Sequence, residues 1–231
     1  GSDHLMELAY TDVTARSINA EGTITSALAG AGADGASFAP FTTEVLANNS
    51  LASQLKMVAR LIAARNELGN KRQVFFVAMS GFDLHDNLLG GHNTLLDRLS
   101  LAMAAFQQSM VNLGVNDKVT AFTASDFGRT LTSNGDGSDH GWGSHHFVVG
   151  GAVKGKAFYG KAPPVSVGNG TGAEDQWHVG SGRLLPSTSV DQYAATLARW
   201  FGVGSGELSG ILPNVGHFGS ADYPLDLGFL S

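Results

Sequence analysis

The stretches VFFVAMSGFDLHDN, residues 74–87, and KVTAFTASDFGRTLTSNGDGSDHGWGSHH, residues 118–146, carry the strongest pattern in the chain. Each begins near a short apolar run rich in Val and Phe, Val74–Met79 in one and Val119–Ala124 in the other. Such runs are typical of buried strands. Each run is followed by a turn of small residues that carries a carboxylate, Asp83 in the first and Asp126 in the second. We therefore expect two strands that deliver acidic side chains to one place.

The segment between the two runs has the period of a helix. Apolar residues recur at steps of three or four, and Gly114 follows at a position where helices commonly end; the stripe is Leu95, Leu99, Met103, Phe106, Met110 and Leu113. Strand, helix and strand of this length predict a right-handed βαβ unit with parallel strands. The fold class expected is α/β, a mostly parallel sheet with helices on both faces.

Three further helices are predicted outside this unit, the first over about residues 7–19 with only loose apolar periodicity. Residues 42–68 carry an apolar stripe and end before Gly69, a common helix stop. The tetrapeptide Ser189–Gln192 has the pattern of a capping box and opens an amphipathic segment that ends at Gly202.

The composition indicates the domain organisation and excludes several classes of function. The 231 residues are 43% hydrophobic and 15% charged, which predicts one globular α/β domain over residues 7–231 with its core at about 51–218. Gly1–Met6 resembles a cloning remnant. The net charge of -6, without basic clusters, argues against nucleic-acid binding. The absence of cysteine excludes disulfides and thiolate ligands, and no apolar run approaches the roughly 20 residues of a membrane span.

Asp83 and His85 form the first candidate pair for metal binding. In an extended segment, residues two apart point the same way, so both side chains could face one ion. Carboxylate and imidazole together suit zinc or manganese. A turn or capping role for Asp83 is an equal alternative on local pattern alone, and the expected convergence with Asp126 favours a site.

The second polar loop offers Asp126, Arg129, Asp139 and His140. Asp126 could bind metal or cap a helix beginning near Phe127. Arg129 could pair with Asp126 or hold an anionic substrate through its forked donors. Asp139 and His140 could bind metal or form a turn.

The remaining histidines carry weaker signals. His92 could start the crossover helix or support the first loop. His145 and His146 alternate if extended, so at most one is expected to face a site with His140, while His178 and His217 are expected to be structural. No G-x-S-x-G motif is present, which argues against a serine hydrolase.

Several motifs in order resemble one known family. They are GFDLH (Gly81–His85), TASDFGRTLTSNG (Thr123–Gly135), SDHGWGSHHFVVGGAVKG (Ser138–Gly155), Tyr159-Gly160 and PSTSVDQYAATLARWFGV (Pro186–Val203). At these motifs the chain is similar to bacterial proteins of unknown function, usually exported by the twin-arginine route and placed in the alkaline phosphatase/sulfatase superfamily. The resemblance implies a periplasmic or secreted protein that hydrolyses a small phosphate or sulfate ester with divalent metal (zinc, manganese or calcium) and no organic cofactor.

The resemblance also implies roles for individual residues. Asp83 and His85 would bind one metal ion, Asp126 a second, and His140 would be the late histidine ligand, with Arg129 orienting the anionic group. Two departures stand out: Asp126-Phe127-Gly128 lacks a histidine ligand, and Asp83 and His85 are closer in sequence than the usual pattern. No nucleophile-bearing strand precedes Val74, so the chain resembles the C-terminal portion of a longer protein with an incomplete site. The alternatives are a non-catalytic exported binding protein and a structural metal that holds the His140 loop.

Overall fold

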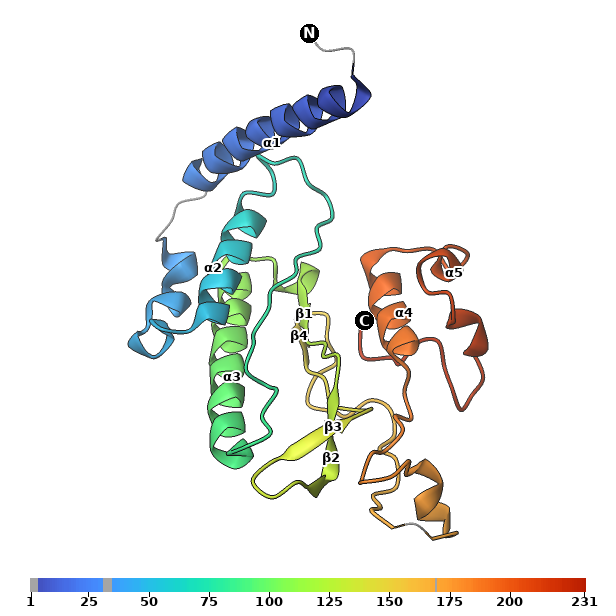
Figure 1. The fold of residues 1–231 in the computed structure, drawn as a ribbon. Helices are drawn as coiled ribbons and strands as arrows, with labels where there is room; N and C mark the ends of the chain where they lie inside the picture. Colours follow the sequence, from blue (N-terminus) through green and yellow to red (C-terminus); the bar gives the residue numbers. More distant parts are fainter. Residues whose placement is uncertain (1–3, 31–34, 169) are drawn as a thin grey trace. The chain divides into compact units, whose positions relative to one another are not determined.

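The computed structural model describes residues 4–30, 35–168 and 170–231, so residues 1–3 of the predicted cloning remnant Gly1–Met6 lie outside the described part. The chain divides into two compact units (Figure 1). The first contains Gly1–Met79 and Arg98–Val115, and the second contains Ser80–Asp97 and Asn116–Ser231. Across the described ranges, no helix combines the length and the apolar character needed to cross a membrane.

The first unit is helical. It contains α1 (Leu5–Gly30), α2 (Ser50–Ala63) and the larger part of α3 (Leu88–Asn112), with the 3-10 helices η1 (Ala36–Thr42) and η2 (Glu44–Leu46) between α1 and α2. The amphipathic helix predicted over residues 42–68 is confirmed in its central part. One face of α2 is buried at steps of one and three residues; it consists of Leu51, Ala52, Leu55, Val58, Ala59 and Ile62.

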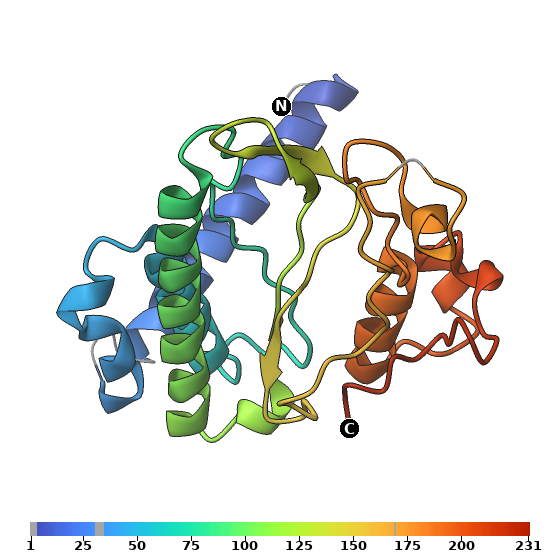
Figure 2. The same ribbon diagram turned by 90° about the horizontal axis from the view of Figure 1, so that it is seen from below.

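Asn49 determines where α2 begins. Its side-chain oxygen accepts a hydrogen bond from the backbone N–H of Ala52 at 3.2 Å, which caps the helix. Its side-chain nitrogen donates to the carbonyl of Arg98 in α3 at 2.8 Å. One buried side chain therefore satisfies the start of α2 and joins it to α3, beside which α2 lies in Figures 1 and 2.

The helix predicted between the two apolar runs is confirmed as α3, but the strand predicted before it is not, so the expected βαβ unit is wrong. No strand is assigned over Val74–Met79, and the side chains of Val74 and Phe76 are 78% and 92% exposed. The backbone N–H and carbonyl of Ala78 bond instead to the side-chain amide of Gln54, at 3.0 and 2.8 Å. An apolar run becomes a strand only where a neighbouring backbone supplies the ladder, and here one side-chain amide takes that place.

The second unit contains two small antiparallel sheets. β1 (Thr120–Phe122) pairs with β4 (Val148–Gly150), and β2 (Gly128–Ser133) pairs with β3 (Ser138–Gly141). The expectation of a mostly parallel, alkaline-phosphatase-like sheet with helices on both faces is therefore wrong. Because β2 and β3 are neighbours along the chain and are joined by a tight turn, they pair as an antiparallel hairpin.

The turn between β2 and β3 explains this reversal. The N–H of Asn134 donates to the carbonyl of Gly137 at 3.2 Å, and the N–H of Gly137 donates to the side-chain oxygen of Asn134 at 3.0 Å. Gly135 adopts a φ of 126°, which side chains rarely allow. The glycine-rich stretch from Asn134 to Gly137 thus closes a hairpin.

The helix predicted after Ser189 is confirmed as α4 (Val190–Phe201). Ser189 and Gln192 form the capping box, and Gly202 ends the helix in the left-handed conformation at a φ of 102°. Ala195 of α4 packs with Leu208 of α5 (Leu208–Ile211) and with Val215 of η5 (Val215–His217). Two further 3-10 helices complete this unit, η3 (Asn116–Lys118) and η4 (Ala173–Trp177).

Candidate metal centre

The loop that carries Asp83 and His85 is fastened to the β2–β3 hairpin. The N–H groups of Asn87 and Leu88 donate to the side chain and the carbonyl of Asp136, at 3.0 and 3.1 Å. The loop also passes against Gly137, where an added Cβ would lie 2.3 Å from the carbonyl oxygen of His85. A residue without a side chain is therefore required at the point where the two segments touch.

His140 approaches the loop from β3. It stands opposite Arg129 in the register of the hairpin. Its ring stacks on that of Phe127, with centroids 4.0 Å apart and planes 5° apart. Its Nε2 atom lies 2.7 Å from Oδ1 of Asp83, although the two residues are 57 positions apart in the sequence.

Asp83, His85 and His140 form a compact triad. His85 Nε2 lies 3.0 Å from the same Asp83 oxygen, and the two imidazole centroids are 5.1 Å apart. One donor atom from each residue lies within 4.8 Å of the other two. The hydrogen bond with His140, together with the charges of both histidines, lowers the pKa of the Asp83 carboxyl. The triad can present one carboxylate oxygen and two imidazole nitrogens to a single ion.

The triad is open to solvent. The exposed fractions of the side chains are 63% for Asp83, 47% for His85 and 43% for His140. An ion held by these three side chains would therefore remain accessible to water or to a small molecule.

Asp126, the fourth predicted ligand, lies outside the triad that the described residues form. It is exposed in the turn before β2, where the hydroxyl of Ser125 donates to the carbonyl of Phe127 at 2.9 Å. The chain continues into a strand at Gly128, so the alternative in which Asp126 caps a helix near Phe127 is wrong.

Arg129 makes hydrogen bonds to both segments that carry the triad. One guanidinium nitrogen donates to the carbonyl of Ser138 at 2.7 Å, and another donates to the carbonyl of Phe82. The guanidinium carbon also lies 5.5 Å from the centre of the Phe127 ring. These bonds join the Asp83 loop to β3, whereas its predicted role in orienting an anion stays a prediction.

Asp139 and Phe127 are neighbours of the triad; the sequence offered Asp139 as either a metal ligand or a turn residue, and it did not indicate Phe127. Oδ1 of Asp139 lies 3.6 Å from Nδ1 of His85, the ring nitrogen turned away from Asp83. In the sequence, Asp139 is indicated by its position next to His140. No sequence signal marks Phe127 as the residue beneath His140, because stacking depends on how the hairpin folds.

The other histidines lie outside the triad. His92 meets the ring of Phe82 edge-on at 6.0 Å between centroids, and His146 stacks on Tyr193 at 5.7 Å. The Nε2 atom of His178 accepts a hydrogen bond from the N–H of Gly182 at 2.7 Å, which agrees with the expected structural role.

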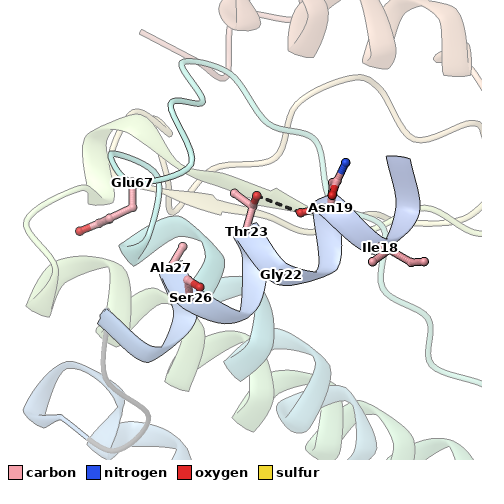
Figure 3. A pocket seen from close by; sticks show the side chains of 7 residues that line it. All are labelled: Ile18, Asn19, Gly22, Thr23, Ser26, Ala27 and Glu67. Carbon is pink, nitrogen blue, oxygen red and sulfur yellow. Dashed lines mark hydrogen bonds between the residues drawn. The ribbon is translucent and has the colours of Figure 1, made fainter. Parts of the chain in front are cut away.

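A surface pocket in the first unit is unrelated to these residues. Figure 3 shows its lining, mostly from α1, where the hydroxyl of Thr23 donates to the carbonyl of Asn19 at 3.0 Å. Its only ionisable side chain is that of Glu67. The lining offers no histidine and no pair of carboxylates for metal binding; it consists of Ile18, Asn19, Gly22, Thr23, Ser26, Ala27 and Glu67.

The comparison with protein families matches residues 8–204 to the model described as protein of unknown function (DUF1501). The chain belongs to the DUF1501 family. Neither a curated protein nor a solved structure matches it. The assignment to the alkaline phosphatase/sulfatase superfamily and to twin-arginine export is therefore not supported and is withdrawn, since the family match carries no such function and the sheets are antiparallel. For this DUF1501 protein, the periplasmic or secreted location stays a prediction.

Proposed function

We propose that Asp83, His85 and His140 bind one divalent transition-metal ion, with zinc as the preferred ion. The observation that carries the proposal is the convergence of three donor atoms within 4.8 Å of one another, from two segments distant in sequence. Two imidazoles and one carboxylate are a ligand set that zinc commonly takes in proteins. Calcium, also considered from the sequence, prefers a shell of oxygen ligands and fits this set poorly.

The number and exposure of the ligands favour a reactive metal over a closed structural one. Structural zinc sites normally take four protein ligands, whereas catalytic sites keep three and leave one position for water or substrate. The triad supplies three, and all three side chains are exposed. A zinc ion bound there would act as a Lewis acid and lower the pKa of a bound water.

The function proposed for this site is hydrolysis of a small anionic ester, with phosphate esters as the first class to test. An anionic oxygen is the natural ligand for an open position on a divalent cation. The guanidinium of Arg129 donates to two carbonyls, so the anion would bind to the metal while Arg129 holds the loop.

The experiment that tests metal binding is titration of the purified chain with zinc, followed by calorimetry, with elemental analysis after dialysis. We expect one zinc ion per chain in the wild type and none in the double variant Asp83→Ala/His140→Ala. His145→Ala is the matched control, because His145 is an exposed histidine outside the triad. Absence of zinc binding by the wild type would refute the proposal and favour the non-catalytic binding protein.

Hydrolysis is tested separately on the zinc-loaded protein with nitrophenyl phosphate and nitrophenyl sulfate.

A structural metal is the second candidate, because the ligands connect the Asp83 loop to β3, two segments 57 residues apart. Zinc that raises the melting temperature without any turnover, in a chain with stoichiometric metal, would support this structural role against the hydrolytic one.

A further inference from the structure

The carboxylate of Asp139 lies beside the ring nitrogen of His85 that faces away from the triad. Nε2 of His85 is 3.0 Å from Oδ1 of Asp83, and its Nδ1 is 3.6 Å from Oδ1 of Asp139. His85 therefore lies between two carboxylates, one on each ring nitrogen. We propose that Asp139 is the positioning residue that orients His85 for metal binding through Nε2; this inference rests on the metal site proposed above.

Histidines that bind metal almost always donate their second ring N–H to a carboxylate, a backbone carbonyl or water. An imidazole that binds metal through Nε2 carries its proton on Nδ1, and a carboxylate that accepts this proton in a hydrogen bond fixes both the tautomer and the ring orientation. The present separation of 3.6 Å is that of an ion pair and exceeds a hydrogen bond. We expect it to shorten when Nε2 engages a metal ion and Nδ1 holds the only ring proton.

Asp139 is itself held in place by the hairpin. Its backbone N–H donates to the hydroxyl of Thr130 at 3.1 Å. The side-chain nitrogen of Asn134 lies 3.3 Å from Oδ1 of Asp139 and donates to it. Because Asn134 also closes the turn through Gly137, the carboxylate is anchored to the same structure that carries His140.

The two histidines of the triad are thus oriented by different means. His140 is fixed by stacking on Phe127, with planes only 5° apart. His85 meets a ring less closely: its centroid lies 5.1 Å from that of His140 at an interplanar angle of 31°. Loss of the Asp139 carboxylate should therefore affect His85 and leave His140 in place.

The test measures zinc affinity by competition with a chromophoric chelator in the wild type, Asp139→Ala, Asp139→Asn and Asp86→Asn. Asp139→Ala should weaken zinc binding by about 10- to 100-fold with one ion still bound, the usual effect of losing an outer partner of a histidine ligand. Asp139→Asn keeps an oxygen that can accept from Nδ1 and should recover most of the affinity. Asp86→Asn removes the same charge from the exposed neighbour of His85 and should bind as the wild type does.

A second measurement determines which ring nitrogen of His85 carries the proton and which binds the metal. In the zinc-bound wild type, nitrogen NMR of His85 should show the proton on Nδ1 and the metal on Nε2, and metal on Nδ1 would overturn the proposal. A wild type that binds zinc, with Asp139→Ala equally tight or no weaker than Asp86→Asn, overturns the positioning role alone. A wild type that binds no zinc refutes the metal site itself, and the positioning role with it.

Discussion

His140 lies face to face on Phe127, with the ring centroids 4.0 Å apart and the planes 5° apart. Phe127 follows the turn that contains Asp126, and His140 belongs to the opposing strand, so the stacking depends on the pairing of β2 with β3. The ring of His140 presents its Nε2 atom to Asp83 because its flat face is supported from this side.

Removal of this support should weaken metal binding. We expect Phe127→Ala to lower zinc affinity by about 10-fold or more, since the His140 ring gains freedom that binding must then remove. Phe127→Tyr keeps the stacked ring and serves as the control. Zinc titration by calorimetry measures both, and equal affinity in Phe127→Ala and the wild type would show that the stacking does not orient the ligand.

Arg129→Lys separates two roles for this residue. Lysine keeps the positive charge but cannot donate to the carbonyls of Phe82 and Ser138 at once. If Arg129 holds the Asp83 loop against β3, the variant should lose zinc affinity with no substrate present. If Arg129 instead binds an anionic substrate, zinc affinity should be unchanged and only the KM for an ester should rise.

Gly137→Ala should disturb the contact between the hairpin and the Asp83 loop. The new Cβ would lie 2.3 Å from the carbonyl oxygen of His85, so one backbone must move. Overpacking of this kind costs about 1–3 kcal/mol, and we expect loss of stability in urea together with weaker zinc binding. Gly206→Ala is the control, because nothing lies within 4 Å of its added Cβ.

Asn49→Ala should destabilise the first unit without touching the metal centre. The change removes the cap of α2 and the hydrogen bond that the Asn49 side chain donates to the carbonyl of Arg98. Loss of a helix cap and of a partly buried hydrogen bond together should lower the free energy of unfolding by about 2–3 kcal/mol. Urea denaturation measures this. Asn214→Ala, at an exposed helix start where the side chain makes no capping bond, should change it little.

The lowered pKa of His146 predicts that the stability of the protein depends on pH. Desolvation, and then the neighbouring charge of His145, lower the pKa of His146 below its ordinary value of 6.5. The unfolded chain therefore binds the proton more readily than the folded chain, and stability falls as the pH drops below about 6.5. The melting temperature of His146→Gln should fall less between neutral and mildly acidic pH than that of the wild type. An identical pH slope in both would contradict the assignment.

Local signals in the sequence were sufficient for α3 and α4. The stripe before Gly114 predicted α3, and the pattern from Ser189 to Gln192 predicted the capping box of α4, because both depend on residues only a few positions apart. The apolar run Val74–Met79 failed as a strand prediction for the opposite reason. A strand needs a partner backbone, which no local pattern specifies.

For the candidate site too, the sequence indicated some features and only the tertiary structure decided the others. Sequence alone determined that aspartate and histidine gather in two loops, and the Asp-x-His spacing indicated Asp83 and His85 as candidate ligands. The family resemblance added His140, which the residues alone left open between a ligand and a turn. Only the tertiary structure decided that these three meet while Asp126 lies outside the triad, that Arg129 bonds to two carbonyls, and that Asp139 faces His85. The way in which the Asp83 loop meets the β2–β3 hairpin controls these outcomes, and no local pattern specifies that meeting because it joins residues as far apart in the chain as Asp83 and His140, 57 positions.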